Sequence, residues 1–289
     1  MSLLNVIILA IVQGLAELLP VSSSAHVVVV EKLLGLDPSS PPLTLLLVML
    51  HTGTMVAVIA YFWSRWRSTY FRTAAAFRSF AGHLVIATAC TAVIGAGIVK
   101  IIEKTVFRNV PHAQIEDLFG HLEFMAPALA AVGMLIVIAG MFGNRRPTAA
   151  SSVTTDVNAS RAGLIGAVQG LSLPFRGFSR SGATISVGML LGMAKSRAEA
   201  FSFALAVVLT PPVVAREVMR LINSSQLNGT SDLGAVALLT VLGGVVAFLA
   251  GLLALKWLSR WLEGGRWYVF GIYCLFAAAA VALLHRVGY

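Results

Sequence analysis

Residues 11–26 read IVQGLAELLPVSSSAH, an apolar helical stretch that stops at a proline and restarts after a run of serines. The apolar segment around it extends over residues 1–36. The break at residues 20–24 leaves each half shorter than the roughly 20 helical residues that cross a hydrocarbon core. The pattern therefore predicts a re-entrant hairpin, helix–turn–helix. Its turn must lie against protein or a water-filled cavity, because lipid cannot hydrogen-bond free backbone groups.

A second segment of the same kind covers residues 162–194 and is broken at residues 174–182. Its AVQGL at 167–171 echoes IVQGL at 11–15, which indicates an internal duplication: a first repeat over 1–150 and a second over 151–289 within one membrane domain. Each hairpin precedes three full spans, so an odd number of spans separates the hairpins and the second repeat is inverted. The simpler alternative is two ordinary short helices that look alike because the composition is biased.

The composition agrees with a membrane protein, since 58% of the 289 residues are hydrophobic and 11% are charged, against about 25% charged in soluble domains. We therefore expect an all-α polytopic membrane protein with six transmembrane helices and two re-entrant hairpins. The start of the chain has no basic residue and no cleavage site after its apolar run, so we keep it in the fold. The expected spans are 41–63, 82–102, 123–142, 200–219, 233–255 and 267–284.

The net charge of +9 is explained by membrane orientation. A nucleic-acid partner is not expected, because no basic patch is interleaved with aromatic residues. The loops at 64–81, 143–161 and 256–266 hold ten Lys or Arg, whereas the opposite loops and the C-terminal tail hold five. The positive-inside rule then places the ten in the cytoplasm and both termini in the periplasm. Hairpin one opens to the periplasm.

Ionisable and polar residues gather at the break of the first hairpin. Gln13 and Glu17 are four residues apart and share one helical face. A carboxylate in an apolar segment is costly unless it meets a cavity, a partner charge or a metal, so Glu17 is a functional candidate; a structural, protonated carboxyl is the alternative. After the break come Ser22, Ser23 and Ser24 and then His26, beside a helix N-terminus suited to phosphate.

The second hairpin adds cationic and hydroxyl side chains. A guanidinium between two half-helices requires an anion, and its planar fork suits phosphate oxygens. The alternative partner of Arg180 is Glu17, in a structural ion pair. The candidate phosphate-binding residues here are Arg176, Ser179, Arg180, Ser181 and Thr184. Only Cys90 and Cys274 are present, which argues against disulfides and thiolate metal sites.

The two motifs, at 13–26 and 177–186, resemble the signatures of the undecaprenyl-diphosphate phosphatase family of the bacitracin-resistance type. The likeness extends over nearly the whole chain, including 51–53 and 201–206. It implies six spans with two re-entrant helix pairs, a divalent cation such as Mg or Ca, and hydrolysis of the C55 carrier-lipid diphosphate outside the cytoplasm. Gln13 and Glu17 match the acidic motif, and His26, the serines and Arg180 match the catalytic set. This chain departs from the usual family pattern, in which glycine directly follows the proline: Phe175-Arg176 is inserted between Pro174 and Gly177.

Our hypothesis is hydrolysis of a polyprenyl diphosphate to the monophosphate and inorganic phosphate. Arg180 holds the diphosphate, Glu17 with Gln13 anchors the cation or orients the nucleophile, and the nucleophile is His26, Ser23 or water. A transporter or flippase of an anionic solute or lipid phosphate is the alternative. Another lipid-phosphatase type, which needs a histidine downstream of its Ser-Arg, is excluded because none follows Arg180 before His285.

We read the other histidines as ordinary, with His51 the one to test. The bilayer and the lipid are the expected partners, and a homo-oligomer is left open.

Overall fold

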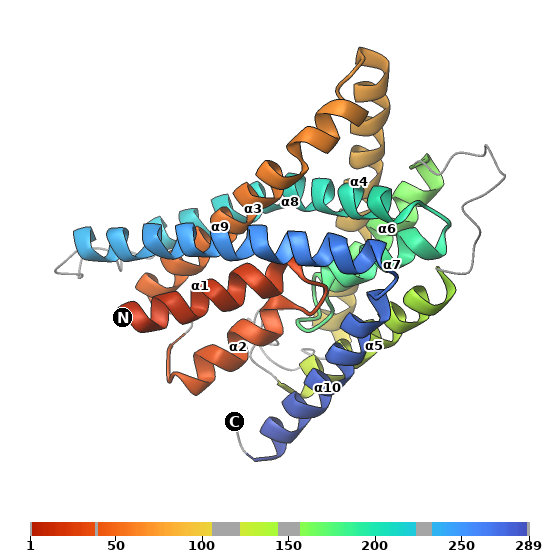
Figure 1. The fold of residues 1–289 in the computed structure, drawn as a ribbon. Helices are drawn as coiled ribbons and strands as arrows, with labels where there is room; N and C mark the ends of the chain where they lie inside the picture. Colours follow the sequence, from red (N-terminus) through yellow and green to blue (C-terminus); the bar gives the residue numbers. More distant parts are fainter. Residues whose placement is uncertain (1, 38–39, 106–121, 144–156, 224–232, 288–289) are drawn as a thin grey trace.

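The fold is built from helices in the part of the chain that the structure, a computed structural model, describes: residues 2–37, 40–105, 122–143, 157–223 and 233–287. The helices are drawn in Figure 1. They are α1 (Leu3–Leu18), α2 (Ser23–Leu33), α3 (Pro41–Thr69), α4 (Ala74–Thr105), α5 (Leu122–Phe142), α6 (Ala159–Ser172), α7 (Arg180–Leu190), α8 (Lys195–Asn223), α9 (Leu233–Glu263) and α10 (Trp267–Arg286).

Six of these helices, α3, α4, α5, α8, α9 and α10, are long and apolar enough to cross a membrane, which confirms the expected spans. The sequence-based ends were wrong at several helices, because the backbone stays helical beyond the apolar stretch. Thus α3 continues through Arg65 and Arg67 to Thr69, and α9 continues to Glu263. Much of what we took for basic loops at 64–81 and 256–266 is therefore helix.

The four short helices form the two helix–turn–helix units expected from the breaks. Helix α1 begins after Ser2, whose hydroxyl accepts from the amide of Asn5, and it ends as Leu19 turns extended ahead of Pro20. Helix α7 begins after Ser179, whose hydroxyl accepts from the amide of Gly182. At 11–16 residues each, these helices are too short to span. Their re-entrant placement stays a prediction.

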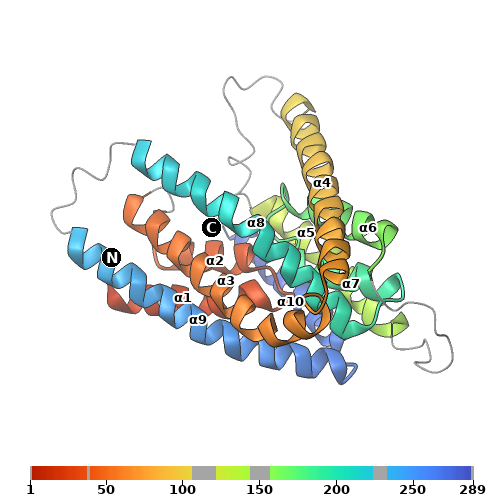
Figure 2. The same ribbon diagram turned by 90° about the horizontal axis from the view of Figure 1, so that it is seen from above.

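Helices from the first half of the chain pack against helices from the second half. Helix α1 packs on α9 and helix α6 packs on α4, while α5 lies along α10 and α3 along α8. Figures 1 and 2 show α1 beside α9 in both views. Each half thus supplies the partner for the first helix of the other. The expected boundary at residue 150 lies outside the described residues, so the division into repeats also stays a prediction.

Glycines set the closest of these helix contacts. A Cβ on Gly53 of α3 would overlap the carbonyl oxygen of Gly244 in α9, and one on Gly166 of α6 would overlap that of Ala87 in α4. Lipid gives no hydrophobic drive for helices to associate, so such close backbone packing is a main source of their affinity.

Replacing Gly53 with Ala should therefore destabilise the fold, because α3 and α9 must separate to admit the methyl group. Gly82, on α4, has no atom within 4 Å of its would-be Cβ, and Ala there should be neutral or stabilising by up to about 1 kcal/mol from helix propensity. Thermal unfolding in detergent, followed by size-exclusion chromatography, should show a lower midpoint for Gly53→Ala only. Equal midpoints for the two variants would contradict the close contact.

Candidate active site

The turns of the two hairpins meet and hydrogen-bond to each other. The hydroxyl of Ser181 donates to the carbonyl of Leu19 at 3.4 Å, and the amide of Gly177 donates to the hydroxyl of Ser24 at 3.4 Å. Helix α10 joins them, because the thiol of Cys274 donates to the carbonyl of Pro20 at 3.3 Å. Backbone groups freed at the breaks are thus partly satisfied across the junction, as apolar surroundings require.

Glu17 lies at this junction and links the hairpins. Its Oε1 accepts from Nη2 of Arg180 at 2.7 Å, and its Oε2 accepts from the hydroxyl of Ser23 at 2.5 Å and from Nε2 of Gln13 at 3.1 Å. The Glu17 side chain is 14% exposed and that of Arg180 24%. The ion pair that the sequence left as an alternative for Arg180 is therefore formed in this structure, within reach of solvent.

His51, from α3, completes the surroundings of the carboxylate. Its Nδ1 lies 3.0 Å from Nε2 of Gln13 and 3.7 Å from Oε2 of Glu17. An amide nitrogen can only donate, so the contact with Gln13 makes Nδ1 an acceptor and leaves the proton of a neutral ring on Nε2. Our interpretation of His51 as an ordinary histidine overlooked this contact.

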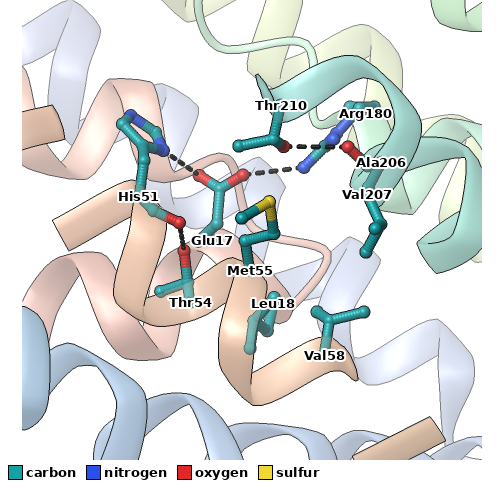
Figure 3. Close-up of a pocket in the computed structure, with 10 residues that line it drawn as sticks. All are labelled: Glu17, Leu18, His51, Thr54, Met55, Val58, Arg180, Ala206, Val207 and Thr210. Atoms are coloured by element: carbon teal, nitrogen blue, oxygen red, sulfur yellow. Dashed lines mark hydrogen bonds and ion pairs between the residues drawn. The ribbon is translucent and has the colours of Figure 1, made fainter. Parts of the chain in front are cut away.

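A pocket opens beside Glu17, with about 260 Å³ of empty space that includes open solvent. Figure 3 shows Glu17 between His51 on one side and Arg180 on the other, over a floor of apolar side chains from α3 and α8. The pocket therefore has one polar edge and one apolar wall. Its lining residues are Glu17, Leu18, His51, Thr54, Met55, Val58, Arg180, Ala206, Val207 and Thr210.

Ser23 and Arg180 occupy the same position in their hairpins. Each is the first residue of the second short helix, after the N-caps Ser22 and Ser179. The two therefore approach the carboxylate of Glu17 from opposite hairpins, one with a hydroxyl and the other with a guanidinium. This is a nucleophile beside a base, facing a cation suited to phosphate.

The N-terminus of α2 carries the other predicted residues of hairpin one. Ser22 has φ +68°, the left-handed region that few non-glycine residues adopt, and its hydroxyl makes no capping bond. The hydroxyls of Ser22 and Ser24 lie 3.2 Å apart. The first amides of this helix point toward the turn and, with its dipole, favour an anion.

His26 is held by α10 rather than by Glu17. Its Nδ1 lies 2.7 Å from the carbonyl oxygen of Ser22, and its Nε2 lies 2.6 Å from the hydroxyl of Tyr273. The rings of His26 and Tyr273 stack, with centroids 5.7 Å apart and planes inclined by 13°. His26 is not among the residues lining the pocket beside Glu17.

The predicted residues of hairpin two divide between the junction and the interior. Ser179 and Ser181 have their hydroxyls bonded to backbone at the junction. Thr184 is fully buried, with its hydroxyl 2.5 Å from that of Ser202 and 2.8 Å from the carbonyl of Arg180, so it joins α7 to α8 and does not face the pocket. Arg176 interacts with the charges of Glu31 and Glu217.

The oxygen donors for a cation are few. Among the described residues, no three His, Cys, Asp or Glu side chains gather where one ion could bind them. The carboxylate of Glu17 and the hydroxyl of Ser23 are hard donors of the kind that Mg and Ca accept. Gln13 turns its amide nitrogen toward Glu17 and His51, so its amide oxygen would have to rotate to reach a shared ion. Mg is often held by one or two carboxylates together with substrate phosphates and water. The residues present fit that partial type of site.

The chain is similar over nearly its whole length to known bacterial proteins. The family model described as "Bacitracin resistance protein BacA" matches residues 6–280. The chain belongs to this family. It is 52% identical to "Undecaprenyl-diphosphatase 2" of Acinetobacter baylyi, over 98% of both chains. It is 33% identical to "Undecaprenyl-diphosphatase" of Rhodopirellula baltica, again over 98% of both chains, and 34% identical to "Undecaprenyl-diphosphatase 2" of Burkholderia orbicola, over 96% of this chain and 95% of that protein.

For this member of the bacitracin-resistance family, we expect that replacing Arg180 alone will destabilise the junction of the two hairpins. Arg180→Ala leaves the carboxylate of Glu17 mostly buried without its cation, at a cost of about 1–3 kcal/mol for a partly exposed pair. The double variant Glu17→Gln/Arg180→Ala should recover part of that loss. Thermal midpoints in detergent measure both effects.

The matched control is Arg260→Ala, which removes an exposed arginine near the end of α9. It should leave the midpoint unchanged. If the thermal midpoint of the double variant fell by the sum of the falls for Glu17→Gln and Arg180→Ala, the two side chains would not interact in the folded protein.

Proposed function

We propose that this protein hydrolyses undecaprenyl diphosphate to undecaprenyl phosphate and inorganic phosphate, returning the carrier lipid for cell-wall synthesis. One observation carries the proposal: the carboxylate of Glu17 accepts from a hydroxyl and a guanidinium at the polar edge of a half-apolar pocket. Hydroxyl, carboxylate and guanidinium are the groups that phosphoryl transfer requires. The names of relatives at 33–52% identity over nearly full length support the same activity.

The two sides of the pocket suit the diphosphate group of such a lipid and the apolar chain next to it. Met55, Val58 and Val207 line the apolar wall, which suits the first isoprene units. The diphosphate would lie at the polar edge, where Arg180 moves from Oε1 of Glu17 to the phosphate oxygens. The hydrogen bond from Nη2 of Arg180 to Oε1 of Glu17 is then exchanged for a two-point contact with phosphate oxygens, which the guanidinium fork fits. The first amides of α2 bind the same anion.

The chemistry follows from the short contact between Ser23 and Glu17. Glu17 takes the hydroxyl proton as the Oγ of Ser23 attacks the terminal phosphorus, and the bond to the bridging oxygen breaks to release the lipid monophosphate. Water then attacks the phosphoserine, its proton passes to the departing phosphate, and Glu17 returns a proton to Ser23. Direct attack by water, with Glu17 as its base, and a phosphohistidine on His26 are the alternatives. Rapid quench separates them, because phosphohistidine is labile in acid and phosphoserine is not.

His26 acts in this scheme as a general acid or base. It follows Ser23 by three residues on α2, so the two side chains are neighbours on one face of the helix. Its Nδ1 is held by the carbonyl of Ser22, so the imidazole can take up and return a proton at Nε2 once the substrate displaces the hydroxyl of Tyr273.

A divalent cation, Mg or Ca, would be held by Glu17 with Gln13 and the diphosphate oxygens. It would neutralise charge on the phosphates. Once Arg180 turns to the substrate, Oε1 of Glu17 is left without its partner and is available to the cation.

Purified protein in detergent should release inorganic phosphate from undecaprenyl diphosphate, in a reaction that responds to added Mg or Ca. Glu17→Gln should abolish both the release and the response to metal. Arg180→Lys keeps a charge but loses the fork, and its activity should fall by about 10² or more. Phosphate release over time measures all three.

Arg260→Lys serves as the matched control and should turn over normally. Near-normal phosphate release by Arg180→Lys would contradict the assigned role of Arg180. Movement of lipid or solute across a vesicle membrane by wild-type protein without any phosphate release would favour the transporter alternative.

We further propose that the protein lies in the bacterial inner membrane with Glu17 and His26 reached from the periplasm. The count of ten basic residues against five supports this orientation. Arg65 and Arg67, at the end of α3, would face the cytoplasm, and the start of α3 would face the periplasm. A carrier lipid that has delivered its cargo outside the cell becomes diphosphate on that face.

Single cysteines test the orientation in a background with Cys90 and Cys274 replaced. A cysteine at Asp37, exposed between α2 and α3, should react with an impermeant maleimide in spheroplasts, whereas one at Ser68, exposed near the end of α3, should stay protected. Gln226, a second expected periplasmic position, lies outside the described residues and should label like Asp37. The opposite pattern would place the site on the cytoplasmic side.

A further inference from the structure

His26 has both ring nitrogens engaged in this structure. Nδ1 lies 2.7 Å from the carbonyl oxygen of Ser22, and Nε2 lies 2.6 Å from the hydroxyl of Tyr273 on α10. The rings also stack, at 5.7 Å between centroids. Tyr273 is separated from His26 by 247 positions in the chain, so the contact is set by the fold.

These contacts select one tautomer of the ring. A carbonyl oxygen can only accept, so Nδ1 carries a proton. In the neutral imidazole Nε2 is then an acceptor, and the hydroxyl of Tyr273 donates to it. Without that hydroxyl, the carbonyl of Ser22 and the stacked ring would still contact the imidazole, but rotation of the imidazole would no longer be opposed at Nε2.

The supports on either side of this ring are themselves held in place. The carbonyl that accepts from Nδ1 belongs to Ser22, the one non-glycine residue with positive φ among the described residues. The residue after Tyr273 is Cys274, whose thiol donates to the carbonyl of Pro20 in the same turn. Helix α10 is therefore fixed to hairpin one at two successive residues, by Tyr273 to His26 of α2 and by Cys274 to Pro20 of the turn. The positive φ of Ser22 is costly, and such a conformation persists only where its surroundings enforce it.

We propose that Tyr273 is a positioning residue for His26: its hydroxyl and ring fix the plane and the tautomer of the imidazole before substrate arrives. The inference rests on the proposed function, in which His26 acts on the diphosphate. Holding a catalytic ring in its productive orientation lowers the entropic part of the barrier. The effect should therefore appear in kcat, while KM, which reports largely on Arg180 and the apolar wall, should change little.

The test uses Tyr273→Phe, which keeps the stacked ring and removes only the hydroxyl. Full-length protein labelled with ¹⁵N-histidine is studied by NMR in detergent, and the His26 signals are assigned by their loss in His26→Gln. In the wild type we expect protonated Nδ1 and unprotonated, hydrogen-bonded Nε2. In Tyr273→Phe we expect the Nε2 signal to move to that of a ring without this bond, and kcat to fall about tenfold, as for one lost hydrogen bond.

The matched control is Tyr268→Phe, on the same helix with 41% of the residue exposed against 46% for Tyr273. It should change neither the His26 signals nor kcat. A ring that only packs would give unchanged His26 signals in Tyr273→Phe, and a hydroxyl that only blocks the site would give a higher kcat; either result overturns the proposal. If wild-type protein releases no phosphate, the proposed function fails, whereas the NMR comparison still decides whether Tyr273 holds His26.

Discussion

The ion pair between Glu17 and Arg180 is the interaction on which the rest of the site depends. A carboxylate within an apolar segment is expensive to bury, and so is a guanidinium between half-helices. Each offsets the cost of the other at 2.7 Å. The same bond joins two turns that are 163 residues apart in the chain. In the proposed function, an anionic lipid that attracts Arg180 would also release the carboxylate that the arginine neutralises. Structural support and catalytic potential thus come from one contact.

The two hairpins provide similar scaffolds but not similar chemistry. Gln13 is followed four residues later by Glu17, whereas Gln169 is followed four residues later by Leu173. Gln169 is fully buried and contacts Thr91 in α4, with its amide oxygen unpartnered. The first hairpin therefore contributes the carboxylate and the hydroxyl, and the second contributes the guanidinium. A phosphate bound between the hairpins would meet a carboxylate and a hydroxyl on one side and a guanidinium on the other.

Sequence reasoning was sufficient for the features with local signals. The six spans follow from apolar length, the hairpin breaks from Pro20 and the serines, and the pairing of Gln13 with Glu17 from their four-residue spacing. Apart from the ion pair between Arg180 and Glu17, which their opposite charges in two apolar hairpins indicated as one alternative, contacts between distant helices had no such signal. His51 lies inside an ordinary apolar span, and Tyr273 is one aromatic residue among several in α10, so neither its neighbours nor its spacing predicts a contact with hairpin one. The helix ends were misjudged because hydropathy reports the hydrocarbon boundary and not where the backbone stops being helical.

The exchange of helices between the halves has a consequence for how the protein is made. Helix α1 leaves the ribosome first, yet its packing surface on α9, where Gly14 meets Ala247 and Ala250, is synthesised more than two hundred residues later. At about 5–20 residues per second, this interval lasts on the order of ten seconds or more. Glu17 is made 163 residues before Arg180, and the α9 face follows later still. Until α9 is made, helix α1 therefore lacks the surface against which it packs in the folded protein.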